Sequence, residues 1–510
     1  MRIDLSGADP TDGAAMRRKI VALMSGGLIG KIVGVGRELL VASLYGTGPV
    51  ASAYRLAQAA LFIPINFFTA DVLNAAVIPL QRQYQGSGDK DAEARFATIV
   101  LMGFGLFGLL LGLLMVCFAS DLVRVLAPTF NAPTHACATM FLQILSLGAP
   151  LYILAGLMSY LEMGAGGHSL TSARATVQSV GLIASTCAAY YLGQSALLAT
   201  GFVLAQIVCC VWGWRRLTAL GLIRRTSIRS DQVKEVVRRV LRLMRPLILL
   251  PILMQGNFAV ERIVATQLAD GAVAAIDYAR LVSDTVNILI TVPFALAVLS
   301  ELAGKSADEI RRALLGIAVP LTLLTVPASG FLYVHAHDVV ALMYGRGAFG
   351  ERSILLTSAI LSTMSIGLWA QALGYIAQKA LAAQLRNRTA VAFMMISLAV
   401  SVAINLVVSR WIGVAAIGLA VTGYGVVNSV MAARAFGYSF KELSPIGWMI
   451  AGEIAYIALA AAIDWPSGLK GLVIAAVASG IFWIVWIGAN SRLRRTMLGY
   501  MKTRVQGRTI

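Results

Sequence analysis

Charged side chains inside apolar stretches are the residues of this sequence that could do chemistry. The stretch GLIGKIVGVGRELLVASLYG (residues 27–46) is long and apolar enough to cross a bilayer, yet it contains Lys31, Arg37 and Glu38. Each such charge costs roughly 2.5–3.5 kcal/mol at the centre of a membrane helix on insertion-based scales. A chain can hold these side chains where they face one another or water. Cationic side chains in such a place can bind an anionic group.

Similar charges recur in the second, seventh and eighth apolar stretches, at about residues 51–80, 246–269 and 272–302. We interpret these charges together as the lining of a hydrated cavity. The predicted cationic, substrate-binding residues are Lys31, Arg37, Arg55, Arg262 and Arg280. The predicted residues for charge balance, or for a coupling ion, are Glu38, Asp71, Glu261 and Asp284. Glycines and prolines of the same stretches are predicted hinges, namely Gly34, Gly36, Pro64 and Pro293.

An alternative interpretation is structural. Arg37–Glu38 and Glu261–Arg262 could be ion pairs that join helices. Residues near the ends of the stretches, such as Arg55 and Arg280, could reach the membrane interface instead. Glu453 stands alone in a later stretch, where a groove contact, a proton site and a packing residue remain open.

No pattern of a catalytic or metal site accompanies these charges. The sequence has no P-loop, and its four histidines form no HExxH motif. The five cysteines lie in or beside apolar stretches without a CxxC pair, which is typical of small hydrophobic residues. We therefore expect a transporter rather than an enzyme, without a metal or cofactor. The membrane potential or a gradient of H⁺ or Na⁺ would drive it.

Composition predicts the fold class. Of the 510 residues 58% are hydrophobic and only 13% are charged, whereas soluble proteins have about 25% charged residues. Apolar runs of about 20 residues recur along the chain and predict an all-α polytopic membrane protein with about fourteen transmembrane helices.

The basic residues indicate orientation. A net charge of +18 would point to nucleic acid in a soluble protein, but here the basic residues lie mainly between apolar stretches. Lys and Arg concentrate in alternate loops and at both ends, so the positive-inside rule predicts that both termini are cytoplasmic. We expect no nucleic-acid partner.

An internal repeat predicts the domain organisation. RELLVASLYGTGPVASAYRLA, from Arg37, aligns with RIVATQLADGAVAAIDYARLV, from Arg262, with a gap of one residue. We predict two pseudo-symmetric six-helix lobes (1–219 and 246–437), a basic linker (220–245), and two last helices with a basic tail (438–510). The linker contains an amphipathic helix that fits an anionic lipid surface, although a solvated linker is the alternative.

Several stretches resemble the MurJ/MviN branch of the multidrug/oligosaccharidyl-lipid/polysaccharide exporter superfamily, which are fourteen-helix inner-membrane flippases for lipid-linked saccharides. The matching stretches are GKIVGVGRELLVASLYGTG, AAVIPLQRQY, AVERIVATQLADGAVAAIDYARL, LMYGRGAFG, ALAAQLRNRTAVA and GVAAIGLAVTGYGVVNSV. They are spread over nearly the whole chain. The resemblance implies a bacterial inner-membrane protein in which the last two helices form a groove for a prenyl tail.

The resemblance also implies a substrate, a polyprenyl-diphosphate-linked saccharide moved to the periplasmic leaflet by alternating access. Two departures affect which saccharide. Asn66 and Phe67 stand where the family commonly has paired arginines, and Arg280 and Leu281 stand where it has Asp-Arg. We therefore expect an exopolysaccharide-type repeat unit, with lipid II, the peptidoglycan precursor, as the alternative. An ion-coupled multidrug exporter and a partner of glycan-assembly enzymes are further alternatives.

Overall fold

The structure, a computed structural model, describes residues 29–69, 71–224, 226–302, 306–384, 386–491 and 493–494. All regular elements in these ranges are helices, which confirms the all-α fold class. Seven described helices are long and apolar enough to cross a membrane, and eleven spans result if each of four bent pairs is one span. The predicted number of about fourteen is therefore not confirmed.

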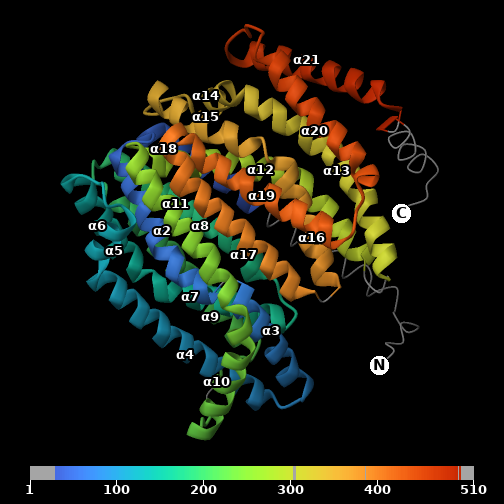
Figure 1. The fold of residues 1–510 in the computed structure, drawn as a ribbon. Helices are drawn as coiled ribbons and strands as arrows, with labels where there is room; N and C mark the ends of the chain where they lie inside the picture. Colours follow the sequence, from blue (N-terminus) through green and yellow to red (C-terminus); the bar gives the residue numbers. More distant parts are fainter. Residues whose placement is uncertain are drawn as a thin grey trace. The chain divides into compact units, whose positions relative to one another are not determined.

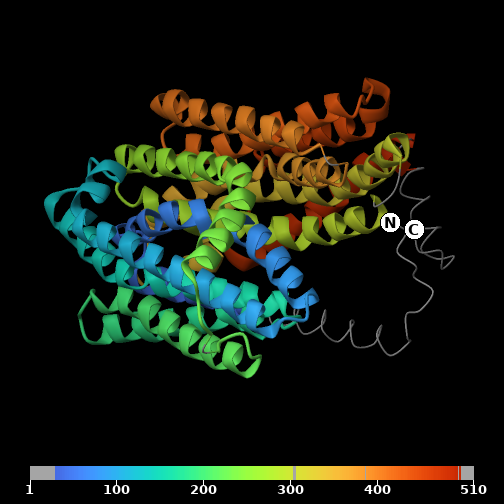
Figure 2. The ribbon, with the colours of Figure 1, turned by 90° about the horizontal axis from the view of Figure 1, so that it is seen from below.

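The chain folds as two compact units, the first of which comprises residues 29–45 and the described residues from Pro49 to Ala259. After the helical residues 29–45 its elements are α2 (Pro49–Thr69), α3 (Asp71–Gly86), α4 (Lys90–Cys117), α5 (Ala119–Leu126), α6 (Ala132–Leu147), α7 (Ala149–Gly164), α8 (Ser169–Tyr191), α9 (Leu197–Ala219), α10 (Ser230–Met244), η1 (Arg245–Leu247) and the first part of α11 (Leu249–Leu268). Helices α8 and α9, in the teal-to-green part of the chain, pack side by side (Figure 2).

The second unit begins at Val260, within α11, and also includes Gly46–Gly48. Its further elements are α12 (Ala272–Leu302), α13 (Ala307–Val334), α14 (Ala336–Tyr344), α15 (Glu351–Ser365), α16 (Leu368–Ala383), α17 (Asn387–Ala403), η2 (Ile404–Val408), α18 (Ser409–Ile412), α19 (Ala415–Ala435), α20 (Phe440–Ala460) and α21 (Gly468–Ala489). Helices α20 and α21, at the red end of the chain in Figure 1, pack with α13. The predicted boundaries of lobes, linker and last helices stay a prediction.

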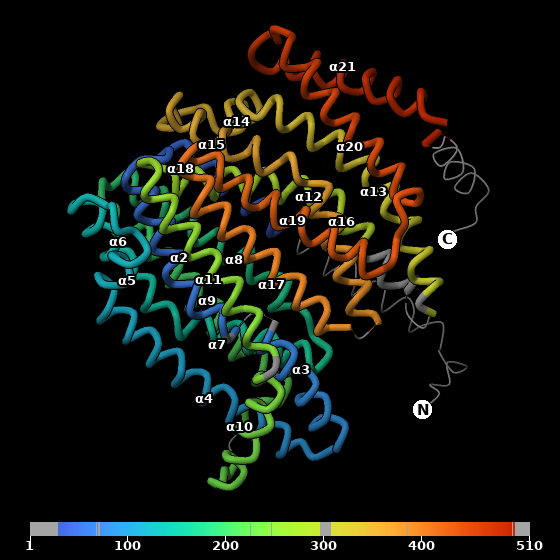
Figure 3. The backbone as a smooth tube through the Cα atoms, viewed as in Figure 1, coloured from blue at the N-terminus to red at the C-terminus, as the bar shows by residue number. Residues whose placement is uncertain are grey.

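The two units repeat one order of elements. The long helices α4 and α13 each have 28 residues and are each followed by a short helix, α5 or α14; Figure 3 shows α13 passing into α14. A bent helix pair comes next in both units, and two further packed helices follow, α8 with α9 and α17 with α19. This order matches the predicted pseudo-symmetry.

The bent pairs α6–α7 and α15–α16 turn at a glycine. Helices α6 and α7 are bent by 42° around Gly148, and α15 and α16 by 51° around Gly367. A Cβ atom on Gly148 would lie 2.8 Å from the buried ring of Phe202, and one on Gly367 would lie 2.6 Å from Thr422 Oγ1. Both bends therefore depend on the close approach that only glycine allows.

Side chains take up the carbonyl groups that the second bend leaves without helical amide donors. The last three carbonyl oxygens of α15 each accept a hydrogen bond from a side chain. Thr422 Oγ1 lies 2.7 Å from the oxygen of Thr363, Gln371 Nε2 lies 3.3 Å from that of Met364, and Ser329 Oγ lies 2.7 Å from that of Ser365. The three side chains come from α19, α16 and α13. Hydroxyl and amide donors of this kind make a broken helix tolerable within a membrane.

The prolines behave differently from these glycines. Helix α2 continues through Pro64, and α12 continues through Pro293. A proline removes one hydrogen bond of the helix without having to end it in a membrane protein. The bend of 43° after α2 falls at its junction with α3, so the span is not interrupted at Pro64. The predicted hinge roles stay predictions.

The helix predicted in the basic linker is α10, and its apolar residues form two stripes rather than one face. The buried stripe, at spacing of four residues, consists of Val236, Val240 and Met244 and packs on the apolar core of the first unit. The exposed stripe consists of Val233, Val237 and Leu241. Burial of the first stripe fixes α10 to its unit and leaves the second without a protein partner among the described residues.

Candidate functional site

In the first unit, the carboxylate of Glu38 lies between two arginines. Arg37 donates from Nε to Glu38 Oε1 at 3.0 Å, and Arg55, on α2, pairs with the same carboxylate. Both Glu38 and Arg55 are 7% exposed, whereas the side chain of Arg37 is 23% exposed. Two guanidinium groups share the carboxylate of Glu38, and Arg37 is the more exposed of the two.

Lys31 lies on the same helix as Arg37 and is exposed. The glycines between them are not packed closely: a Cβ on Gly34 would meet Ser179 Oγ at 3.8 Å, and one on Gly36 would meet no described atom within 4 Å. Close packing therefore does not explain either glycine, and the hinge role remains a prediction for both.

In the second unit, the predicted residues pair between α11 and α12. Glu261, 1% exposed, accepts two hydrogen bonds from Arg280 Nη2, at 2.7 and 3.0 Å. Arg262, 6% exposed, donates to the carbonyl oxygen of Val273 at 2.8 Å and pairs with Asp277. The neighbours Glu261 and Arg262 thus bind different partners on α12, and their charges join two helices.

The two units differ in the net charge of their predicted site residues. In the first unit, the described residues are Lys31, Arg37 and Arg55 against Glu38. In the second they are Arg262 and Arg280 against Glu261 and Asp284, the last of which is exposed, and Arg262 also pairs with Asp277, which was not among the predicted site residues. With Asp71, whose side chain lies outside the described residues, the predicted residues are three cations and two acids in the first unit and two cations and two acids in the second. An excess of one positive charge therefore lies on the first unit.

A buried carboxylate that the sequence analysis did not assign holds the end of α7. Glu162 is fully buried and accepts hydrogen bonds from the amide of Leu170 (2.8 Å), the hydroxyl of Ser169 (2.5 Å) and Arg216 Nε (2.9 Å). A Cβ on Gly167 would lie 2.6 Å from Glu162 Cγ. The acid therefore fixes the glycine-rich turn between α7 and α8. Its signal in the sequence was a charge near the end of an otherwise apolar stretch.

The YGRGAF motif forms an aromatic cluster. The rings of Tyr278, Tyr344 and Phe349 lie 5.2 to 5.4 Å apart and are almost completely buried. Arg346 donates to the carbonyl oxygen of Met343 at 2.6 Å, at the end of α14. The motif thus has a structural role.

The turn Gly46–Gly48 contacts the same part of the second unit. Tyr278 donates from its hydroxyl to the carbonyl oxygen of Gly46 at 3.2 Å, and the hydroxyl oxygens of Thr47 and Ser353 are 2.8 Å apart. Gly46 has a φ of +55°, and a Cβ there would clash with the carbonyl oxygen of Ala348. Glycine is therefore required at this position for two independent reasons.

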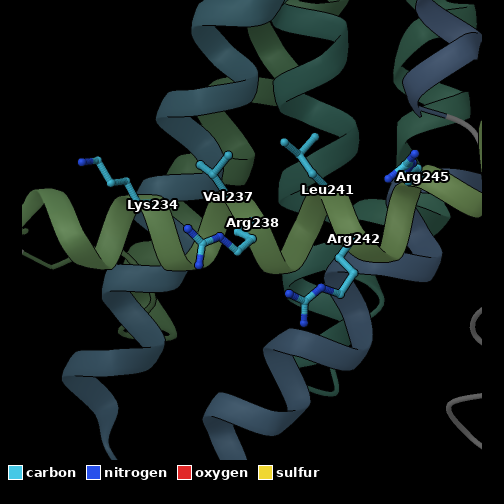
Figure 4. Close-up of a pocket in the computed structure, with 6 residues that line it drawn as sticks. All are labelled: Lys234, Val237, Arg238, Leu241, Arg242 and Arg245. Atoms are coloured by element: carbon cyan, nitrogen blue, oxygen red, sulfur yellow. The ribbon is translucent and has the colours of Figure 1, made fainter.

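A groove of about 790 Å³ runs along α10 and η1 (Figure 4). Its lining residues are Lys234, Val237, Arg238, Leu241, Arg242 and Arg245. All six are exposed, and Val237 and Leu241 point the same way from the helix (Figure 4). The groove combines four positive charges with part of the exposed apolar stripe of α10.

Comparisons with known proteins agree with one family. The family model described as "Lipid II flippase MurJ" matches residues 41–487. A protein of Rhizobium meliloti (strain 1021) named "Probable lipid II flippase MurJ" is 26% identical over 478 residues, covering 88% of this chain and 87% of the relative. A Synechocystis protein of the same name is 27% identical over 383 residues, covering 69% and 68%.

Solved structures show the same fold. "Lipid II flippase MurJ, inward closed conformation" has a TM-score of 0.80 at 16% identity, with coverage of 96% of this chain and 100% of that chain. An inward-facing multidrug resistance MATE family transporter has a TM-score of 0.65 at 16% identity, covering 85% and 98%. At these identities the structural likeness concerns the fold alone. The family model matches most of the chain, and on that ground the chain belongs to the MurJ family.

Proposed function

We propose that this protein moves lipid II from the cytoplasmic to the periplasmic leaflet by alternating access. Its support is the family match over residues 41–487, together with the printed names of the relatives. The exopolysaccharide-type unit expected from the departures at Asn66 and Arg280 has no such support, so the comparisons favour the alternative. Members of this family are transporters, and no enzymatic step is proposed.

The diphosphate of the substrate is proposed to bind the positive charges of the first unit. The observation that carries this assignment is the sharing of Glu38 by Arg37 and Arg55. The carboxylate holds Arg37 in one orientation and leaves part of its guanidinium group exposed. Lys31 adds an exposed ammonium group on the same helix. Guanidinium groups bind phosphate oxygens through paired hydrogen bonds.

The test is transport of lipid II in cells depleted of their own lipid II flippase. Wild-type protein is expected to restore growth and to expose lipid II at the outer leaflet, measured with an externally added probe of that leaflet. Arg37→Ala and Lys31→Ala are each expected to reduce exposure at least tenfold at equal expression. Arg124→Ala is the control, because Arg124 is exposed on α5 and forms only a surface pair with Asp121 at 3.5 Å.

Two results would contradict the proposal. Normal lipid II exposure in both variants would reject the cationic site. A wild-type protein that exports a polyprenyl-diphosphate-linked exopolysaccharide unit but exposes no lipid II would reject the substrate. Cationic drugs remain the less suitable cargo, since the described site residues of the first unit are net positive.

Anionic membrane lipids are the proposed partner of α10. Exposed Val233, Val237 and Leu241 can enter the acyl-chain boundary while the adjacent basic residues meet phosphate groups, as in interfacial helices. Each basic residue near an anionic surface contributes about 1 kcal/mol. Coupling to the membrane potential, H⁺ or Na⁺, contacts with glycan-assembly enzymes, and cytoplasmic termini stay predictions.

A further inference from the structure

Glu453, on α20, differs from the other buried acids of the described chain. Four described acidic residues are buried, namely Glu38, Glu162, Glu261 and Glu453. The first three accept hydrogen bonds from an arginine. Glu453 is 3% exposed, and no described cation pairs with it. Its charge, if present, would therefore be neutralised by none of the described side chains.

The polar neighbours of Glu453 come from α13 and α16. The hydroxyl of Ser329, on α13, contacts the Glu453 carboxyl group, and the indole of Trp369, on α16, lies beside it. Ser329 Oγ also lies 2.7 Å from the carbonyl oxygen of Ser365, at the bend between α15 and α16. The hydroxyl of Ser329 is fully buried between these two oxygen atoms.

The number of available hydrogens decides the protonation state. The serine hydroxyl has one hydrogen to donate, and the carbonyl oxygen of Ser365 can only accept. If Ser329 donates to Ser365, its oxygen must accept from Glu453, which requires a carboxylic acid. If Glu453 were a carboxylate, two acceptors would compete for one hydrogen, and one short oxygen–oxygen contact would be repulsive. A protonated carboxyl that donates to Ser329 leaves the carbonyl oxygen of Ser365 as the only acceptor of the serine hydrogen.

We propose that Glu453 takes up a proton and is a proton-binding site of the second unit. The bound proton completes a chain of hydrogen bonds from α20 through Ser329 to the carbonyl group of Ser365. Burial away from water and from cations favours the neutral form of a carboxyl group, in agreement with the hydrogen count. The proposal does not depend on which glycan the protein moves.

Other titratable groups around α20 are occupied or lie apart from Glu453. On α13, Arg311 pairs with Glu442 at 2.7 Å, near the start of α20. Tyr456 lies one helical turn after Glu453, and its hydroxyl is 3.5 Å from Nε2 of His335, which follows α13. The charged residues of α15, α16 and α21 are Glu351, Arg352, Lys379 and Lys470, and no described hydrogen bond joins any of them to Glu453.

Infrared spectroscopy of the purified full-length protein in lipid nanodiscs tests the proposal. Wild-type protein at neutral pH is expected to show the carbonyl band of a protonated carboxylic acid in the difference spectrum against Glu453→Gln. The control is Glu351→Gln, which removes an exposed glutamate of the same unit and is expected to leave the band intact. A band of equal intensity in wild type and Glu453→Gln would overturn the proposal.

Two further variants keep the test decisive if Glu453→Gln does not fold. Ser329→Ala removes the acceptor of the acid hydrogen, and Trp369→Phe removes the polar indole group beside the carboxyl oxygen. Each is expected to retain the band and to shift it to higher frequency, because the acid loses a polar neighbour. A carbonyl band that neither variant shifts would place the proton on another carboxyl group. A wild-type spectrum without the band would show that Glu453 is ionised. Neither measurement requires transport, so failure here is distinct from failure of the proposed function.

Discussion

The buried ion pairs show how single residues combine a structural and a functional task. Glu38 and Arg55 are both buried and lie on successive helices. Removing one member of a buried pair leaves the other charge without compensation, which costs more than the pair itself contributes. The same contacts that join the helices also fix the position of the more exposed Arg37. Binding and stability are therefore linked at this cluster.

The prediction at this scale concerns Glu38→Gln. We expect it to destabilise the protein by about 3 kcal/mol, because the substitution removes the negative charge between two guanidinium groups. Thermal unfolding of the purified protein measures the effect. The matched control is Asp121→Asn, whose exposed pair with Arg124 contributes less than about 1 kcal/mol. Equal unfolding midpoints for the two variants would mean that the Glu38 pairs do not stabilise the fold.

At the scale of the elements, two turn glycines differ in whether they leave room for a side chain. Gly46 and Gly413 both have a positive φ, of +55° and +59°. Gly413 has open space where a side chain would begin, since no described atom lies within 4 Å of an added Cβ, whereas Gly46 faces the carbonyl oxygen of Ala348. The two glycines therefore differ in the close contact that a side chain would make.

Gly46→Ala is expected to lower stability more than Gly413→Ala. Both variants carry the cost of a side chain at a strained, positive φ, which is about 1–3 kcal/mol, and Gly46→Ala adds the clash with Ala348. The unfolding midpoints of the two purified variants measure this difference in stability. The contact with Ala348 would be unimportant if both variants lost the same stability.

Helix α10 provides a second prediction for an element. The double variant Arg238→Gln, Arg242→Gln is expected to lose most of the phosphatidylglycerol that co-purifies with the full-length protein, measured by native mass spectrometry. Arg239→Gln is the control, because Arg239 pairs with Glu235 at 2.5 Å and does not line the groove. Unchanged lipid retention in the double variant would reject the lipid site.

At the scale of the whole molecule, the repeated order of elements predicts that corresponding bends have corresponding sensitivities. Gly148→Ala and Gly367→Ala each bring a Cβ within 3 Å of a residue on a neighbouring helix. We expect each to destabilise its unit by about 1–3 kcal/mol, as overpacking does. Gly103→Ala in α4 is the control, since no described atom lies within 4 Å of its added Cβ. Loss of stability at only one bend would show that the two units differ in packing there.

Much of this architecture could be predicted from the sequence, and the reasons for the rest are physical. Apolar runs predict helices because each run must satisfy its own backbone in lipid, and the charges at Arg37 and Glu261 stand out against them. Their partners could not be predicted from the sequence: adjacent residues of a helix point in different directions, so Arg262 pairs with Asp277 and not with its neighbour Glu261. Hinges were predicted at Gly34, Gly36, Pro64 and Pro293, but the bends at Gly148 and Gly367 depend on side chains far away in the sequence.

The bend between α15 and α16 has a mechanical consequence. Three helices each contribute a side chain that donates a hydrogen bond to a carbonyl group of the bend. Straightening the bend would therefore break all three hydrogen bonds together. These bonds hold the bend in one geometry and connect it to α19 and α13, so we expect a rigid bend rather than a hinge. We expect this part of the protein to travel as a solid piece during a transport cycle.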